Sequence, residues 1–214
     1  MTIKLYYFNA YGRAEAIRML LNKANVDFED RRIEWGSEEW KALKESGKLE
    51  YGQGPALELD DGTMLCQTNA VLDYLAQTYG FSTHSAMEAY KCQHLISLYQ
   101  EDYGKHSARL WMAKPEDKPA VMDEIASTHF PALAGHLTRK LVDGKTKFLV
   151  ADHLTTADFI VGGFFTNTVC NPNNAFAAKW TEAWEKCSDE LKAYVAAFQE
   201  ELKDYLASRP VCTM

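Results

Sequence analysis

Tyr7 lies near the carboxyl end of a short apolar run, residues 3–8, that has the length and composition of a β-strand. Gly12 follows in a turn that leads into a helical pattern over residues 13–25. Ligands of α/β domains bind beyond the carboxyl ends of strands, so a phenol hydroxyl here could donate a hydrogen bond to a substrate. A strand tyrosine can also be a core aromatic, and this stretch alone leaves both interpretations open.

A second stretch that could take part in ligand binding is the glycine-rich segment around Pro55, residues 52–57. Cis X-Pro bonds concentrate in tight turns of this kind. A cis bond would turn the backbone N–H and C=O of Gly54 outward, where they could pair with an extended peptide. An ordinary proline at the start of a strand is the alternative.

The third stretch places Gln67 and Thr68 where a strand gives way to a helix. Free backbone N–H groups and the helix dipole favour a carboxylate at such a helix N-terminus, although Thr68 could simply cap the helix. A short peptide could pair with Gly54 and place one carboxylate on Gln67 and Thr68. Its side chain would then lie near Tyr7.

The first eighty or so residues contain the elements that must position these groups. Residues 3–8, 26–33, 55–59 and 64–66 read as strands, and Asp60-Asp61-Gly62 is a strong hairpin signal between the last two. Residues 13–25, 37–44 and 68–79 have helical spacing, with Ser37 as a good N-cap. The predicted order is β-α-β-α-β-β-α.

The character of the sequence changes after residue 80, where helical patterns follow a polar linker. The predicted helices are residues 87–111, 118–141, 156–169, 174–186 and 189–206. Pro131 is expected to kink or break the second of these. Thr155 and Asp158 form a capping box, which Leu154 and Phe159 can flank as a hydrophobic staple. The fold class is therefore a small α/β domain followed by an all-α domain.

Composition narrows the choice of partner and compartment. The 214 residues carry a net charge of −7 without a long basic run, which makes nucleic acid and anionic membranes poor partners. We find no span-length apolar stretch and no signal-peptide layout at the N-terminus. The five cysteines are odd in number and widely spaced, which argues against a disulfide framework and a structural zinc site. We expect a cytoplasmic protein with free, mostly buried thiols.

The three stretches together resemble cytosolic glutathione transferases. The resemblance rests on residues 7–15, 52–57 and 67–76, on the helix start at residues 154–159 and on residues 205–210. It covers essentially the whole chain, and the sigma class is the most similar, ahead of mu, alpha and pi. It implies a thioredoxin-like glutathione-binding domain over residues 1–79 and a linker over residues 80–86. Residues 87–214 would form a helical domain that contributes the electrophile pocket and the dimer contacts.

The same resemblance implies an activity and a site. Tyr7 would stabilise the thiolate of glutathione, a co-substrate, with support from Arg13, and no cofactor or metal is expected. The other implied glutathione ligands are Trp40, Lys44, Gln53, Gly54, Pro55, Gln67, Thr68 and, across a homodimer interface, Asp102. Weaker expectations for the wall of a pocket for small hydrophobic electrophiles are Phe8, Tyr11, Tyr103, Ser107 and Trp111.

Three departures from the family pattern concern the glutathione site. Position 54 is glycine where the family usually has an aliphatic residue, and Thr68 replaces the commoner serine. The stretch between Lys44 and Pro55 is longer than usual, by about two residues, which loosens the placement of Trp40 and Lys44. None of these departures removes a chemical group that the mechanism needs.

Alternatives of other kinds remain open. A structural or binding protein on the same scaffold, such as a lens crystallin, would not need the thiolate-stabilising pair. A glutathione-dependent isomerase, such as a prostaglandin D synthase, would keep that pair, and the sequence does not separate it from a general transferase. A cysteine-dependent oxidoreductase would need a cysteine at the strand end, where Asn9, Ala10 and Tyr11 stand instead.

Overall fold

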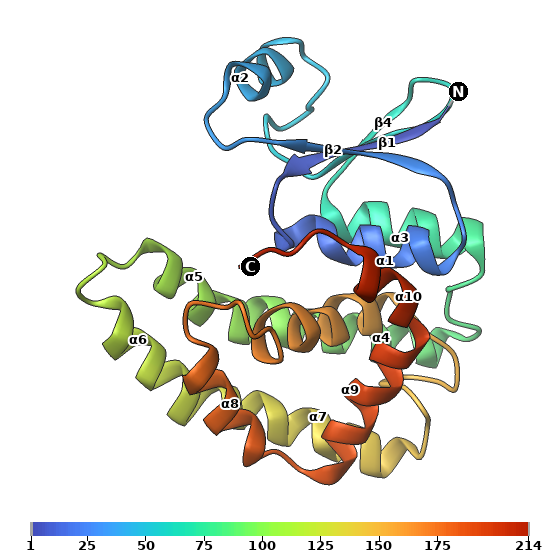
Figure 1. Cartoon of the computed structure of the whole chain (residues 1–214). Helices are drawn as coiled ribbons and strands as arrows, with labels where there is room; N and C mark the ends of the chain where they lie inside the picture. Colours follow the sequence, from blue (N-terminus) through green and yellow to red (C-terminus); the bar gives the residue numbers. More distant parts are fainter. Residues whose placement is uncertain (1, 214) are drawn as a thin grey trace. The chain divides into compact units, whose positions relative to one another are not determined.

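The computed structural model describes residues 2–213. The chain divides into two compact units. One contains the residues up to Ser82 together with those from Leu202 onward, and the other is Thr83–Glu201. Figure 1 shows strands and helices in the first unit and helices in the second. Among the described residues, no helix has both the length and the apolar character needed to cross a membrane.

A mixed four-stranded sheet organises the first unit. Its strands are β1 (Ile3–Phe8), β2 (Phe28–Ile33), β3 (Ala56–Glu58) and β4 (Met64–Cys66), in the order β2-β1-β3-β4. β1 runs parallel to β2, with Tyr7 opposite Arg32, and antiparallel to β3, with Leu5 opposite Leu57. The parallel pair needs a helical crossover and the antiparallel β3–β4 pair only a hairpin, which is why both connection types occur in the sequence.

Helices cover both faces of this sheet. The helices of the first unit are η1 (Gly12–Ala14, a 3₁₀ turn), α1 (Glu15–Lys23), α2 (Glu38–Glu45), α3 (Thr68–Tyr79) and α10 (Lys203–Ser208). Figure 1 shows α1 and α3 together on one face and α2 beyond the other. Ser37 caps α2 by accepting a hydrogen bond from the Trp40 N–H at 3.2 Å. The buried side chains Leu5, Ile17, Leu72 and Leu75 contribute to the core of this unit.

The side chains of β1 alternate between the two faces of the sheet. Tyr6 and Phe8 pack against a cluster of buried residues that includes Ile33 and Trp40. Tyr7 points the other way, so its hydroxyl is not part of that cluster. The period of two in the strand therefore decides which tyrosine is available for chemistry.

Among its described residues, the second unit contains helices and loops but no β-strand. Its segments are α4 (Ala86–Ser97), η2 (Leu98–Tyr103), α5 (Gly104–Met112), α6 (Lys118–Glu124), η3 (Ile125–His129), α7 (Phe130–Gly144), η4 (Asp158–Gly162), η5 (Phe165–Val169), α8 (Ala177–Glu185) and α9 (Asp189–Glu201). The segments η2 to η5 are π-helical. Phe130 and Trp180 meet edge to face in the core, with ring centroids 5.3 Å apart.

Pro131 does not end the helix in which it lies. The chain stays helical from Lys118 to Gly144, and Pro131 falls in the first turn of α7, directly after the π-helical turn η3. A proline lacks the N–H that an α-helix would bond to the preceding turn. The wider hydrogen-bond pattern of the π turn accommodates that missing donor, so the expected break is replaced by a local change of helix type.

Asp158 fixes the start of the helical stretch that begins near residue 156. Its Oδ2 accepts hydrogen bonds from the Thr155 N–H at 2.8 Å and the Thr155 hydroxyl at 2.9 Å. Its Oδ1 accepts a further bond from the Leu149 N–H at 3.1 Å. Leu154 and Phe159 beside it are buried. These contacts confirm the predicted capping box.

The structure confirms the predicted fold class, a thioredoxin-like unit and a helical unit. The grouping of the C-terminal segment differs from the expected helical domain that runs to residue 214. Residues from Leu202 onward group with the first unit. The C-terminal segment groups with the first unit because the Tyr205 hydroxyl and the Arg209 guanidinium both bond to Glu15 on α1, at 2.8 and 2.7 Å.

Candidate active site

Tyr7 is held at the carboxyl end of β1 by contacts with the turn that follows. The backbone N–H of Arg13 donates a hydrogen bond to the Tyr7 hydroxyl oxygen at 3.3 Å. Gly12, which has a φ of +42°, lies against the same hydroxyl, and a Cβ at this position would come within 2.7 Å of it. The oxygen accepts the Arg13 bond, so the hydroxyl keeps its own proton to donate elsewhere.

Gly54 lies close to both Tyr7 and Trp40. A Cβ at Gly54 would lie 3.3 Å from the Tyr7 ring and 3.5 Å from the Trp40 ring. The Gly54–Pro55 bond is cis, as predicted. Lys44, one turn along α2 from Trp40, places its Nζ 5.9 Å from the Trp40 ring centroid.

The start of α3 brings Gln67 and Thr68 together in an unusual backbone conformation. Gln67 has φ 72° and ψ 112°, a positive φ that a non-glycine residue rarely adopts. The Thr68 hydroxyl oxygen is buried and has no hydrogen-bond partner among the described residues. Strained backbone of this kind clusters at binding sites. An unpartnered polar atom at a helix N-terminus suits an anionic ligand group.

Arg18 is fully buried and holds the loop that follows β1. Its Nη1 donates to the Ala10 carbonyl oxygen at 2.7 Å and lies 3.1 Å from Glu15 Oε2. Its Nε donates to Asp30 Oδ1 at 3.0 Å. The guanidinium thus joins α1, β2 and the loop between Tyr7 and α1. Sequence reasoning did not identify this residue, because a charged side chain in an amphipathic helix is normally expected on the exposed face.

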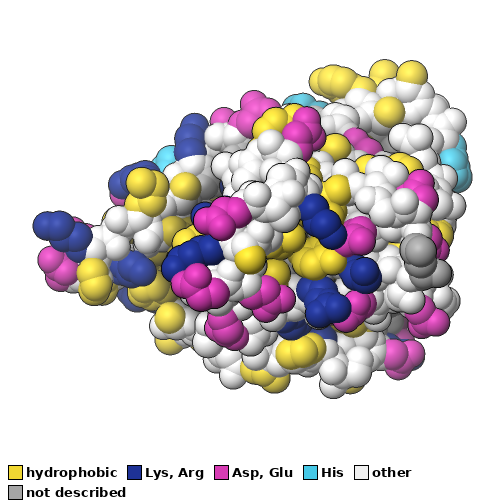
Figure 2. All heavy atoms as spheres, turned by 90° about the horizontal axis from the view of Figure 1, so that it is seen from above, with side chains coloured by type: hydrophobic (Ala, Val, Ile, Leu, Met, Phe, Trp, Pro, Cys, Tyr) yellow, Lys and Arg dark blue, Asp and Glu magenta, His cyan; other side chains and the backbone are white. Residues whose placement is uncertain are grey.

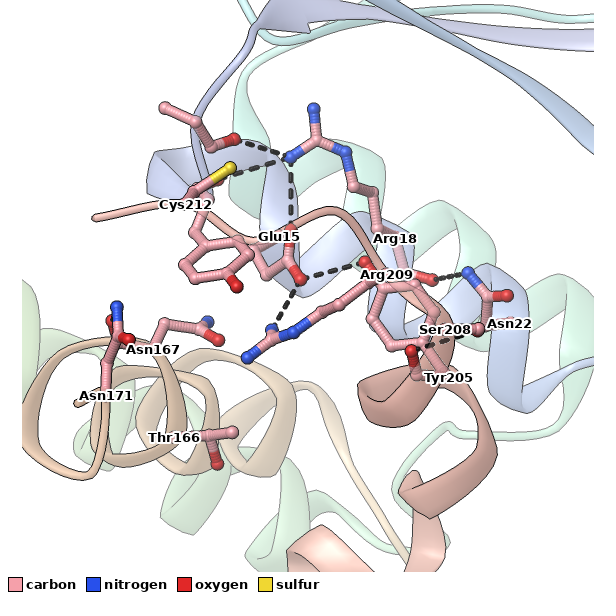
Figure 3. Close-up of polar contacts among 12 residues, drawn as sticks. Glu15, Arg18, Asn22, Thr166, Asn167, Asn171, Tyr205, Ser208, Arg209 and Cys212 are labelled. Atoms are coloured by element: carbon pink, nitrogen blue, oxygen red, sulfur yellow. Dashed lines mark hydrogen bonds and ion pairs between the residues drawn. The ribbon is translucent and has the colours of Figure 1, made fainter. Parts of the chain in front are cut away.

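The C-terminal segment adds a second arginine to the same network (Figure 3). Arg209 Nη1 lies 2.7 Å from Glu15 Oε1, and its guanidinium carbon is 4.1 Å from the centroid of the Tyr11 ring. Burial and the nearby Glu15 raise the pKa of Tyr205, which stays protonated and donates to Glu15 at 2.8 Å. Glu15 is therefore compensated from both sides although it is fully buried.

Two of the expected electrophile contacts have packing partners of their own. Phe8 lies 4.4 Å from the Trp35 ring and 4.7 Å from the Trp40 ring, on the α2 side of the sheet. Tyr11 is buried beneath Arg209. This packing accounts for both aromatics without a ligand, and their place in a pocket stays a prediction.

The remaining expected contacts belong to the second unit. Tyr103, Ser107 and Trp111 are spaced by four residues, so they follow one another along η2 and α5. Tyr103 is buried, Ser107 is half-buried and the Trp111 side chain is exposed. Asp102 is also exposed and lies 3.7 Å from Lys105 Nζ. Its exposure leaves the carboxylate accessible to a partner molecule. Gln53, in the first unit, is exposed as well.

The structure also shows how the charged side chains and the five cysteines are distributed. Figure 2 shows basic and acidic side chains interspersed over the face that it views. All five cysteines are free, with Cys92 and Cys212 buried and the others half-buried. Burial raises the pKa of Cys170 and of Cys187 to about 11, which keeps both as protonated thiols at neutral pH.

The comparisons with known proteins cover both units. The model of the glutathione S-transferase N-terminal domain matches residues 3–77, and that of the C-terminal domain matches residues 101–209. Human glutathione S-transferase A1 is 35% identical over 162 residues, which are 72% of this chain and 68% of the relative. S-crystallin 4 of Enteroctopus dofleini is 30% identical over 169 residues, or 73% of this chain and 76% of the relative.

A solved structure resembles the whole chain. It is that of Na-GST-3, described as a monomeric glutathione S-transferase of the hookworm Necator americanus. The TM-score is 0.85 at 26% identity, with 100% of both chains covered. Taken with the two matching domain models, these similarities show that this chain belongs to the glutathione S-transferase family.

Proposed function

We propose that this protein is a glutathione transferase in which the Tyr7 hydroxyl stabilises the thiolate of glutathione. The observation that carries the proposal is the bond from the Arg13 N–H to the Tyr7 oxygen, which leaves the tyrosine proton available to a bound sulfur. Cys66, half-buried at the end of β4, is not needed as a nucleophile in this scheme. The thiol proton leaves to solvent, and the thiolate sulfur forms a bond to the electrophilic carbon. With an aryl halide the carbon–halogen bond breaks and the halide leaves with its electron pair.

The energy required is within reach of one hydrogen bond. A free thiol has a pKa of about 8.5, so most of it is protonated at neutral pH. Lowering that value by about two units needs about 2.7 kcal/mol of preferential thiolate binding. A hydrogen bond to a charged group contributes about 1.5–3 kcal/mol. Arg13 is exposed and bonds to this hydroxyl through its backbone N–H, and its side chain could add a positive charge near the sulfur.

Glutathione is an extended peptide with a charged group at each end. We assign its γ-glutamyl carboxylate to Gln67 and Thr68, because the buried hydroxyl of Thr68 has no partner within residues 2–213. Its cysteinyl backbone would pair with Gly54, which borders Tyr7. The glycine carboxylate would then reach Trp40 and Lys44 on α2, with Gln53 nearby.

The same proposal extends to the class of the enzyme, its location, its substrates and its assembly. We infer a sigma-type, cytoplasmic enzyme that conjugates small hydrophobic electrophiles in detoxification and needs no cofactor beyond glutathione as co-substrate. We further infer a homodimer in which Asp102 of one chain meets the γ-glutamyl amine bound by the other. The exposure of Asp102 supports this last step.

Conjugation of glutathione to an aryl halide such as chlorodinitrobenzene tests the activity. We expect saturable turnover by the wild-type protein and loss of most of it in Tyr7→Phe. A prostaglandin H substrate in the same panel separates the isomerase alternative, since only an isomerase converts it without consuming glutathione. Glutathione binding without turnover on any substrate would favour a non-catalytic role of the crystallin kind and contradict the proposal.

A further inference from the structure

Two histidines and a glutamate converge in the second unit, and none of the three is assigned above to glutathione. His106 lies on α5, Glu124 ends α6 and His129 lies in η3. One ligand atom from each residue lies within 4.8 Å of those from the other two. His129 Nε2 is 3.0 Å from Glu124 Oε1. We propose that these three side chains form a binding site for a zinc-like divalent cation.

The helices that carry the cluster explain how it forms. Figure 1 shows α5 and α6 next to one another, which brings His106 beside the end of α6. Glu124 and His129 are five residues apart and are joined by a π-helical turn. In a π helix, residues at this spacing come close together, and such turns are frequent at functional sites. The helix type that accommodates Pro131 therefore also aligns the two ligands.

The imidazole rings of His106 and His129 are stacked against each other, which brings their nitrogens close together. Their centroids are 3.3 Å apart, and their planes are inclined by 12°. The Nδ1 atom of His106 is buried and has no hydrogen-bond partner among the described residues. A buried polar nitrogen without a partner is costly, and a metal ion would satisfy it.

The donor set selects the class of cation. Two imidazole nitrogens and one carboxylate oxygen, with a fourth position open, are a zinc pattern. Magnesium and calcium prefer oxygen ligands alone. A cavity of about 180 Å³ beside both rings, lined also by Asp102 and His136, leaves room for a water or another ligand in the open position.

Arg109 competes directly with the cation for Glu124. Its Nη1 and Nη2 lie 2.9 and 2.8 Å from the two carboxylate oxygens. A metal ion at Glu124 Oε1 must displace one of these bonds, so Arg109 weakens metal binding without contacting the metal. Removal of Arg109 should therefore strengthen the site, an effect that a merely structural cluster would not produce.

Zinc titration of the tag-free protein by calorimetry near neutral pH tests the site. We expect one site per chain, with affinity at least about tenfold weaker in His106→Gln and in His129→Gln. His94→Gln, on an exposed face of α4, is the matched control and should bind as the wild type does. Arg109→Gln should bind more tightly. Co²⁺ should give the visible absorption of a tetrahedral nitrogen and oxygen site.

A second group of possible ligands must be separated from this one. His84, Glu88 and His153 also lie close together, with the two rings 4.3 Å apart. The His84→Gln variant should retain the zinc site proposed here. Loss of binding in His84→Gln, unchanged binding in both His106→Gln and His129→Gln, or no zinc binding by the wild-type protein would each overturn the proposal. Circular dichroism of each variant checks that the helices are intact.

Discussion

Tyr7 and Gly12 are in contact so close that a single added methyl group would not fit between them. A Cβ at position 12 would lie 2.7 Å from the Tyr7 hydroxyl oxygen, and Gly12 has a φ of +42°. The turn therefore needs glycine for two separate reasons, its backbone conformation and its room for the phenol. The hydroxyl that we assign to thiolate binding depends on this position.

The Gly12→Ala substitution should therefore affect kcat more strongly than it affects the free energy of unfolding. The added Cβ pushes the Tyr7 hydroxyl away from the Arg13 N–H, and we expect a fall in kcat of roughly tenfold or more. Gly62→Ala is the control, because Gly62 also has a positive φ, 88°, but no atom within 4 Å of its Cβ position. Equal loss of kcat in the two variants would show that backbone strain alone accounts for the effect.

Thr68 should contribute to glutathione affinity and not to the chemical step. Its buried hydroxyl has no partner within the described chain, so a carboxylate would supply the missing bond. Thr68→Val should raise KM for glutathione by roughly tenfold, since a hydrogen bond to a charged group contributes about 1.5–3 kcal/mol. Steady-state kinetics with glutathione varied measure this.

Thr78→Val on the same helix is the matched control for Thr68. The Thr78 hydroxyl already donates to the Tyr74 carbonyl oxygen at 2.8 Å and is exposed. We expect its KM to stay at the wild-type value. If Thr68→Val also left KM unchanged, the assignment of the γ-glutamyl carboxylate to the start of α3 would be wrong.

Arg18 should contribute more to the free energy of unfolding than the exposed Arg31 does. Arg18→Met leaves the buried Glu15 carboxylate with less compensation and removes a partner of Asp30, at an expected cost of about 3–5 kcal/mol. Arg31→Met removes an exposed ion pair with Glu29 and should cost less than about 1 kcal/mol. Denaturant unfolding measures both variants. Similar midpoints for the two would contradict the role given to the buried network.

Asp102 tests the proposed dimer. Asp102→Asn should raise KM for glutathione while light scattering still finds a dimer, because the charge of the γ-glutamyl amine loses its partner. Glu101→Gln, an adjacent exposed acid, should leave KM unchanged. The hookworm relative described as monomeric shows that family members differ in assembly. A fully active monomer of this chain would refute the shared site.

Local patterns in the sequence predicted much of the first unit. The observed bounds of β1, β4 and α3 agree with the runs of strand and helix spacing, and the Gly54–Pro55 bond is cis as expected. β2 begins at Phe28, two residues later than the apolar pattern suggests. Each of these features is determined by neighbours in the chain, which is why periodicity and turn residues suffice to find them.

The contacts that the sequence did not reveal are long-range or depend on helix type. Glu15 meets Arg209 across most of the chain, and no spacing rule connects them. The hydrophobic pattern indicates a helix but does not distinguish a π-helical turn from an α-helical one. His106 and His129 therefore looked unrelated in the sequence, although η3 brings their rings together.

The apparent pKa of the glutathione thiol on the protein tests the central claim most directly. Titration of the thiolate absorbance should give a value about two units below the free thiol for the wild-type protein and a return towards about 8.5 in Tyr7→Phe. Tyr6→Phe is the control, because the Tyr6 hydroxyl donates to Glu58 at 2.7 Å, and its pKa is raised to about 12 by burial and by that carboxylate. An unshifted thiol in the wild-type protein, or the same shift in Tyr7→Phe, would contradict the account.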